Sequence, residues 1–470
     1  MATVLNNLGH RDLLLAGAFA GLGLFAIYRR YNSSSSTSSS DSVKVSTGAE
    51  APSSTKPALA ARSSISPQQH EPGEWKPVQF DYPTIVPSAD DPRNIRPVPY
   101  RPFKWGEYQV MMGLRTMPWD EWFELDEQFE HYYRIRENRL RTRGERLVQV
   151  LPATPGLVNG GHDAAAELVQ EMAEYLSRRY PTMYTVKRNE SASDSSGWYG
   201  LPSIKEITII PVGKTYKIDE EEPMALAGML AQDDIAIMIE GSDGQYYLQA
   251  GVVLIPGMWR LQDKIGMSMD DIHISGTVPQ YDSKLKFGMN RFFTRMPLDK
   301  PVTRANYSFQ VVAPPDIADP SDPNELSWAK TMKGDEEDED NKPGYLNAKD
   351  DAPYESGGGN GNPAVISDLA NSTSAVNPSL VRMRVERETL RRLPRTGAII
   401  FAIRTYQTPL VDLASEPEIP GRLASAIRSW PEDVAVYKAR AAYESVLGYL
   451  DKQYAAQVAA GLTSPLGAKE

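Results

Sequence analysis

The chain contains no cysteine, and this absence removes several kinds of chemistry. Disulfide bonds, zinc sites with cysteine ligands, iron–sulfur clusters and cysteine nucleophiles are all excluded. The absence does not assign the protein to a compartment. Any redox step that needs an iron–sulfur cluster must therefore take place on another protein.

Histidine is nearly as scarce, with five in 470 residues, and this scarcity narrows the search for a metal ligand. His10 and His70 fall in segments that we predict to be an anchor and a linker. His131 lies in a helical pattern and His162 precedes another, so a half-exposed position and a capping role are expected for them. The sequence has no His-Glu-x-x-His motif. His273 is therefore the predicted catalytic or metal-binding histidine.

Basic residues are fewer than acidic ones, so the formal net charge is −11 and the pI is near 5.2. Nucleic-acid binding requires a basic face, so nucleic acid is excluded as the main partner. Hydrophobic residues make up 41% of the chain and charged residues 24%, as in globular proteins. This content is sufficient for one large domain or two of medium size.

Signatures of common enzymes are missing as well. No Gly-x-Ser-x-Gly elbow is present, and the glycine-rich stretch 357–362 neither follows a strand nor precedes Gly-Lys-Thr. Acidic residues are abundant, so a glycosidase with two carboxylates remains an alternative, although no pair stands out.

One long apolar run is present, at Leu13–Tyr28, and it predicts a single transmembrane helix. A helix of this length spans ~24 Å, which is short for a ~30 Å hydrocarbon core and fits the thinner endoplasmic reticulum bilayer better. Arg29 and Arg30 follow at once, so the positive-inside rule places the large C-terminal body in the cytosol. A cleaved signal peptide is the alternative.

Changes in composition divide the chain into segments. Residues 32–74 are rich in Ser, Thr, Pro and Ala and are expected to be a disordered linker after the anchor at 1–31. A folded domain is expected at 75–460, interrupted by a disordered acidic insertion at 320–378 and followed by a tail at 461–470.

Hydrophobic periodicity within the body predicts both helices and strands. Strands joined by hairpins, with helices gathered around them, indicate an α+β fold with an antiparallel sheet. Helices are expected at Trp119–Val148, Asp163–Tyr180, Asp282–Phe293 and Pro431–Ala456, and strands at Ile204–Ile210, Ile235–Glu240, Tyr246–Ile255, Asn306–Val312 and Ala398–Tyr406.

The stretch Pro256–Arg295 surrounds His273 with cationic and aromatic residues, among them Arg260, Lys264 and Tyr281. A flat anionic cofactor requires this mixture, because its metal needs a ligand, its acidic edge needs cations and its faces need apolar surface. The alternative is an ordinary helix–loop–helix with a solvated histidine, and residue types alone favour that alternative.

A second basic stretch, Arg382–Tyr406, contains seven arginines in an acidic protein. Such density suits contacts with carboxylates, although a solvated, ion-paired helix is the expected state of most of them. Arg404 differs because it lies inside an apolar strand, where burial requires a partner. The arginines are Arg382, Arg384, Arg387, Arg391, Arg392, Arg395 and Arg404.

Several ordered motifs resemble those of the haem-dependent oxidative N-demethylase alpha-subunit family. They are MGLRTMPWDEWFELD, YYLQAGVVLIPGMW, WRLQDKIG, DDIHISGTVPQYDSKL, NRFF and RVERETLRRLPRTGAIIFAIRTY. The resemblance covers Lys104–Pro314 and Arg382–Leu410. One departure is Glu388, where the family often has glutamine.

The resemblance implies a PAS-like antiparallel sheet that holds one haem b with a histidine axial ligand, which is His273 here. It implies that Arg260 and Lys264 lie near the propionates and that Arg404 is the family's strand arginine in the pocket. The implied activity uses O2 to remove a methyl group from a small secondary amine. Electrons are then expected from a separate flavin and iron–sulfur reductase.

Two other functions remain open at this point. The chain could be a non-catalytic haem- or ligand-binding module that acts as a sensor or carrier through the same His273. It could also be a scaffold that has lost haem. The resemblance identifies neither the substrate nor the distal residues.

Overall fold

The computed structural model describes residues 70–311 and 376–465, except for residues 192, 256–260 and 439. The predicted anchor at Leu13–Tyr28, most of the linker and most of the acidic insertion lie outside these residues and stay predictions. Among the helices that are described, none is long and apolar enough to cross a membrane.

The centre of the fold is a seven-stranded sheet in which all neighbouring strands are antiparallel. A smaller antiparallel sheet has three strands, so the predicted α+β class is confirmed. In spatial order the large sheet contains β1 (Arg115–Thr116), β8 (Val302–Val311), β9 (Val381–Arg392), β10 (Ile399–Pro409), β6 (Asp233–Glu240), β7 (Tyr246–Val252) and β2 (Val148–Val150). The small sheet contains β3 (Tyr184–Arg188), β4 (Ile204–Ile209) and β5 (Lys214–Lys217).

A tight connection between β9 and β10 sets the register of the two longest strands, with Arg392 opposite Ile399. Gly397 in this connection has φ +72°, and a Cβ atom there would lie 2.3 Å from the ring of Trp75. Only glycine meets both conditions, because it tolerates positive φ and leaves room for the indole. Trp75 in turn donates from Nε1 to the carbonyl of Pro394 at 3.0 Å.

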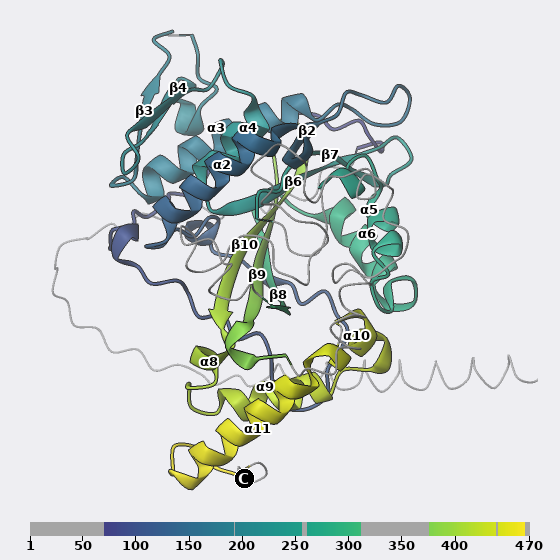
Figure 1. Ribbon diagram of the computed structural model, residues 1–470. Coiled ribbons are helices and arrows are strands. Elements are labelled where there is room, and N and C mark those ends of the chain that lie inside the picture. Colours follow the sequence, from purple (N-terminus) through teal and green to yellow (C-terminus); the bar gives the residue numbers. More distant parts are fainter. Residues whose placement is uncertain (1–69, 192, 256–260, 312–375, 439, 466–470) are drawn as a thin grey trace, which may run out of the picture. The chain divides into compact units, whose positions relative to one another are not determined.

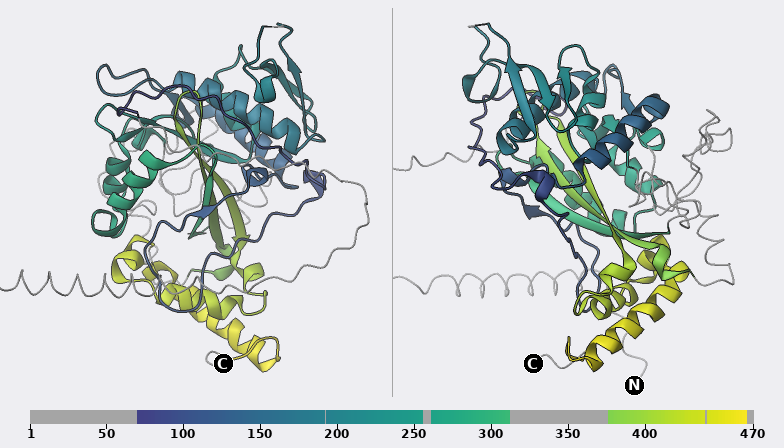
Figure 2. Two further views of the ribbon diagram at one scale, coloured as in Figure 1. Left: turned by 180° about the vertical axis from the view of Figure 1, so that it is seen from behind. Right: turned by 60° about the vertical axis from the view of Figure 1, so that its left-hand side comes forward.

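Helices form three groups around the large sheet (Figures 1 and 2). The helices α2 (Phe129–Leu147), α3 (His162–Arg179) and α4 (Pro223–Leu230) pack together, and α3 and α4 cover the hydrophobic core over β6, β7 and β10. A separate group is formed by α5 (Met269–Ser275), the π-helical turn Tyr281–Leu285 and α6 (Lys286–Arg295). The C-terminal group is α8 (Leu410–Leu413), α9 (Ile419–Arg428), α10 (Glu432–Tyr437) and α11 (Glu444–Ala459).

The predicted helix Trp119–Val148 is shorter than expected, because α2 begins only at Phe129. A short 3₁₀ turn at Trp119–Glu121 precedes it. Trp122 and Phe123 are almost fully buried, and consecutive buried side chains cannot all lie on one helical face. Core packing therefore overrides helix propensity in this segment.

The predicted closing helix Pro431–Ala456 is also interrupted, between α10 and α11. At the end of α10, Lys438 turns inward and donates from Nζ to the carbonyl of Tyr307 at 2.6 Å and to Asn306 Oδ1 at 3.2 Å. A buried ammonium must find such acceptors, and these hydrogen bonds tie the break to β8.

The expectation of a solvated helix for the second basic stretch is wrong. All of Arg382–Arg392 lies in the long strand β9, and four of its arginines are almost fully buried. These are Arg384, Arg387, Arg391 and Arg392.

Candidate functional site

A cavity of about 360 Å³ lies over one face of the large sheet. Side chains alternate between the two faces of a strand, and alternate residues in the middle of β8, β9 and β10 reach the cavity. The volume falls in the range of small-molecule and cofactor sites. The sheet contributes Arg304, Asn306 and Ser308 from β8, Glu386, Glu388 and Leu390 from β9, Phe401 and Ile403 from β10, Ala236 and Met238 from β6, and Leu248 from β7.

The wall opposite the sheet comes from α5, the π-helical turn and α6, and it is largely apolar. Together with Met238, Leu248, Leu390 and Phe401, these side chains make one end of the cavity suitable for a flat hydrophobic ligand. The residues of this wall are Met269, Ile272, His273, Leu285, Met289, Phe292 and Phe293.

His273 belongs to α5 and lines the cavity. Its Nδ1 lies 2.7 Å from the carbonyl oxygen of Met269, one helical turn earlier. A carbonyl only accepts hydrogen bonds, so this contact assigns the proton to Nδ1 and leaves the lone pair on Nε2. Burial lowers the pKa of His273 below its ordinary value. The ring is thus neutral, and Nε2 is the nitrogen available to a metal.

The face of the His273 ring stacks on Tyr281, with centroids 4.7 Å apart and planes inclined by 8°. Tyr281 donates its hydroxyl proton to Asp270 Oδ1 at 2.6 Å, and Asn290 Nδ2 donates to the same oxygen at 2.9 Å. The imidazole is therefore held both by a hydrogen bond and by a supported aromatic ring. Such support fixes the orientation of a metal ligand.

The N-terminus of α5 is capped by Ser268, whose Oγ accepts a hydrogen bond from the backbone of Asp271 at 3.1 Å. The cap satisfies a backbone N–H that has no partner within the helix. It sets where α5 begins and therefore where His273 lies.

Of the other two site residues predicted in the stretch Pro256–Arg295, one lines the cavity and one is not described. Lys264 lines the cavity, is 8% exposed, and donates from Nζ to Ser275 Oγ at 2.8 Å. Burial lowers the pKa of its ammonium group. Arg260 lies outside the described residues, so its prediction stays a prediction.

Arg404 is not among the described residues that line the cavity. Ile403 reaches the cavity, and the alternation of β10 sends Arg404 to the opposite face. There Arg404 is fully buried, with Nη2 2.6 Å from Asp126 Oδ2 and its guanidinium 4.4 Å from the ring centre of Tyr132. The expected need for a buried partner is met by Asp126, and the structure brings Arg404 to no pocket that contains His273.

The end of the cavity away from the apolar wall contains charged residues that sequence reasoning missed. Arg304 Nε lies 3.4 Å from Glu388 Oε2, and Lys438, the residue after α10, is part of the same lining. Burial raises the pKa of Glu388 to about 6 and lowers that of Lys438 to about 8. The alternation Arg384-x-Glu386-x-Glu388 could have revealed the two carboxylates had the segment been assigned as a strand. Nothing in the sequence pairs Lys438 with them.

The composition of the cavity fits a haem. Among the described residues, no group of three or more histidines and carboxylates could hold a metal by itself. A porphyrin supplies its own nitrogen ligands, so one axial imidazole such as His273 is sufficient. The apolar walls suit the faces of the macrocycle, and the cation Lys264, on the same side of the cavity as His273, suits a propionate.

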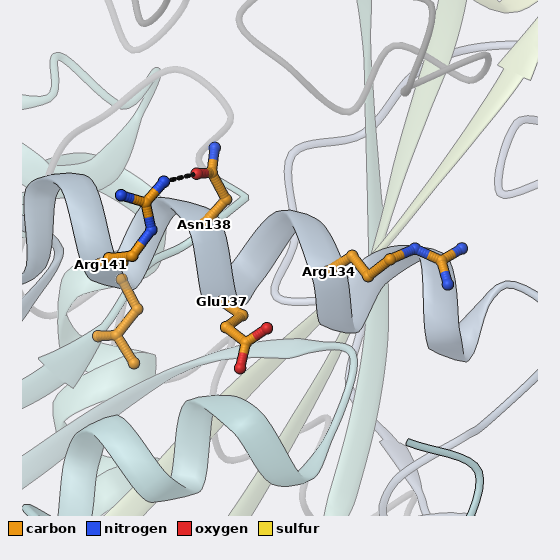
Figure 3. Close-up of a pocket in the computed structure, with 5 residues that line it drawn as sticks. Arg134, Glu137, Asn138 and Arg141 are labelled. Carbon is orange, nitrogen blue, oxygen red and sulfur yellow. Dashed lines mark hydrogen bonds between the residues drawn. The ribbon is translucent and has the colours of Figure 1, made fainter. Parts of the chain in front are cut away.

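A second concave region, of about 500 Å³, lies on α2. Figure 3 shows Arg134, Glu137, Asn138 and Arg141 projecting from this helix, with Arg141 Nη2 donating to Asn138 Oδ1 at 2.7 Å. All of its described lining residues belong to α2, so they supply no opposing wall. It offers no ligand site comparable with the cavity that contains His273.

A family model described as "Haem-dependent oxidative N-demethylase, alpha subunit-like" matches residues 113–448. This range includes His273 and Lys264, every described strand of both sheets, and nearly all of the residues that line the cavity. The chain belongs to the haem-dependent oxidative N-demethylase alpha subunit-like family.

Proposed function

We propose that the chain is the haem-binding subunit of an O2-dependent oxidoreductase that removes an N-methyl group from a small amine. The observation that carries the proposal is the state of His273 in its cavity. Its Nδ1–H donates a hydrogen bond to the carbonyl of Met269, so Nε2, beside apolar walls, would be the atom that binds the haem iron. Haem b is the proposed form, because the sequence has no cysteine for a covalent attachment.

When bound, haem supplies the chemistry of oxygen activation. In the overall change, one N-methylated amine reacts with one O2, two electrons and two protons. The products are the demethylated amine, formaldehyde and one water, and the oxidised bond is a C–H bond of the methyl group. The chain has no cysteine for an iron–sulfur cluster, so a separate flavin and iron–sulfur reductase is the proposed source of electrons.

The residues of the chain have three tasks in this proposal. His273, held by Met269 and Tyr281, provides one ligand in a fixed orientation. The apolar wall of α5 and α6 excludes water from the faces of the cofactor. Lys264 offers a charge-assisted hydrogen bond to a propionate.

The test is the absorption spectrum of the full chain, produced with a haem precursor. We expect a Soret band in the wild type and its loss in His273→Ala. His131→Ala is the matched control, because His131 is also a partly buried helical histidine but is not among the residues that line the cavity. A full-strength Soret band in His273→Ala, or a colourless wild type after haem reconstitution, would contradict the proposal.

Turnover separates an enzyme from a sensor or carrier. With a reductase and a methylated amine, we expect consumption of O2 and release of formaldehyde. A protein that binds haem but consumes no O2 under these conditions is the non-catalytic module.

We also propose that Leu13–Tyr28 anchors the protein in the endoplasmic reticulum membrane with the folded body in the cytosol. The apolar run and the arginines that follow it support this topology. Alkaline extraction of membranes tests it, since an anchored chain stays in the pellet. A full-length chain released into the supernatant would exclude the anchor.

A further inference from the structure

The charged end of the cavity contains a donor and an acceptor without hydrogen-bond partners in the described part of the chain. The Glu388 side chain is 7% exposed, and among the described residues its carboxylate has one close polar contact, Arg304 Nε at 3.4 Å. That contact is an ion pair without hydrogen-bond geometry, and Arg304 Nε has no acceptor there although the atom is buried. A buried carboxylate and a buried N–H without hydrogen bonds are both costly. They are therefore ready to receive a ligand that supplies both partners.

The neighbouring charges differ from this pair. Glu386, which also lines the cavity, accepts a hydrogen bond from Arg384 Nε at 2.9 Å. Lys438 donates to Asn306 and to the carbonyl of Tyr307. Of these two carboxylates in the lining, Glu388 is thus the one that accepts no hydrogen bond from a described residue.

The positions of Glu388 and Arg304 determine how a ligand would be oriented in the cavity. Arg304 and Glu388 are directly opposite in the register of β8 and β9. The next cavity residue along β9 is Leu390, which belongs to the apolar end with Phe293 and Met269. The Arg304 side chain is 32% exposed, so it lies toward solvent. A ligand held by both groups therefore has its anionic end at Arg304 and its cationic end at Glu388. The substituents on the cationic end then point toward the apolar end of the cavity.

We propose that Glu388 and Arg304 are a recognition pair for a zwitterionic amine, and that the preferred substrate is an N-methylated amino acid. Glu388 accepts N–H hydrogen bonds from the ammonium group, and Arg304 Nε donates to a carboxylate oxygen. This inference rests on the proposed function, because it specifies which amine the haem cavity admits. A simple alkylamine engages only Glu388, so it forms one of the two charge-assisted interactions.

The spacing of the two groups favours an α-amino acid. Glu388 and Arg304 are in contact, so the cation and the anion of the ligand must be separated by very few bonds. In the free protein the two side chains attract each other. In the complex Glu388 faces the ammonium group of the ligand and Arg304 faces its carboxylate. Two charge pairs with the ligand then replace the one pair between the side chains.

Calorimetric titration of the full chain tests the pair without requiring turnover. The probes are N-methylglycine, dimethylamine, which lacks the carboxylate, and acetate, which lacks the amine. We expect N-methylglycine to bind at least about tenfold more tightly than either fragment, because each fragment lacks one charged hydrogen bond. Glu388→Gln is expected to weaken N-methylglycine and dimethylamine by a similar factor. Arg304→Gln is expected to remove the preference for N-methylglycine over dimethylamine.

Glu386→Gln is the matched control, since it changes the same residue type on the same face of β9, two positions away. The Glu386 carboxylate is already paired with Arg384, so we expect a much smaller change in affinity. Equal losses in Glu386→Gln and Glu388→Gln would indicate a general charge effect and overturn the specific pair.

The pH dependence gives a second signature. Glu388 faces Arg304, Glu386 and Lys438, and burial raises its pKa to about 6. Its carboxylate must be ionised to accept the ammonium group, so the affinity for N-methylglycine should rise as pH increases through about 6. Lys438, with a pKa lowered to about 8, stays charged across this window. In Glu388→Gln the rise should disappear.

The outcomes separate this inference from the proposed function. A haem protein that binds N-methylglycine no more tightly than dimethylamine, or equally well in Glu388→Gln, overturns the recognition pair and leaves the proposed function intact. A colourless protein that still binds N-methylglycine through Glu388 keeps the pair and overturns the proposed function.

Discussion

The two faces of β8, β9 and β10 contain similar residues in different states. On one face, Arg404 is paired with Asp126, and Arg391 with Glu171, in a closely packed core. The Arg391 guanidinium also lies 4.3 Å from the ring centre of Trp122. On the other face, Arg304 and Glu388 border a cavity, and no described residue completes a hydrogen bond to Arg304 Nε.

The contrast shows that a dense run of arginines does not itself mark a binding site. Arg387 and Glu388 are neighbours in sequence, yet Arg387 contacts Glu124 in the core and Glu388 borders the cavity. The protein's own carboxylates satisfy most of the buried guanidinium groups. Atoms without hydrogen-bond partners occur on both faces, for example Asp233 on the core face and Arg304 Nε on the cavity face, so what distinguishes the cavity face is the open space beside its charged groups.

The largest expected effect comes from breaking a charge pair on the core face. Arg404→Ala leaves the buried carboxylate of Asp126 without its cation, so we expect a loss of about 3–5 kcal/mol in the free energy of unfolding. Denaturant titration measures it. Arg428→Ala, which breaks an exposed pair with Asp451, is the control and should cost less than about 1 kcal/mol. Similar losses in both variants would mean that the buried pair has no special role.

The second prediction concerns Asp233, a buried acid on the core face. Neither of its carboxylate oxygens has a hydrogen bond from the described residues, and burial raises its pKa to about 7. The folded state therefore holds the proton more tightly than the unfolded state, where the pKa is near 3.8. Its contribution to stability is present below pH 4 and is lost as pH rises toward 7.

In Asp233→Asn this loss is absent. We expect the variant to gain a few kcal/mol in stability relative to the wild type between pH 4 and pH 8. Thermal unfolding at several pH values measures the change. A constant difference between the two proteins across this range would show that Asp233 does not titrate there.

The smallest expected effect is on the cavity face. Ser268→Ala removes the N-cap of α5 and should lower the free energy of unfolding by about 1 kcal/mol. Because α5 carries His273, the variant should also bind haem more weakly, as measured by competition with apomyoglobin. Ser429→Ala, which changes a serine at the end of α9 away from the cavity, should leave haem affinity unchanged. If Ser268→Ala bound haem as tightly as the wild type, the cap would have no influence on the position of His273.

Sequence reasoning identified the α+β class, five of the ten described strands (β4, β6, β7, β8 and β10), and His273 as the histidine of interest. Elimination among the five histidines left His273, and the structure places that residue in the lining of the cavity, while its role as a metal ligand stays a prediction. It failed for β9, because strand alternation is hard to see when arginines occupy both faces. It also failed at Trp119–Gln128, where burial of aromatic residues outweighs helix propensity.

The sequence alone restricted the thiolate and imidazole ligands for a metal to five histidines, because the chain has no cysteine. Only the tertiary structure decided which charges remain available to a ligand. Lys438 and Glu388 are 50 positions apart in sequence, yet both border the same cavity. Long-range packing determines where partners and empty space occur, and the pattern of residues along the chain does not contain that information.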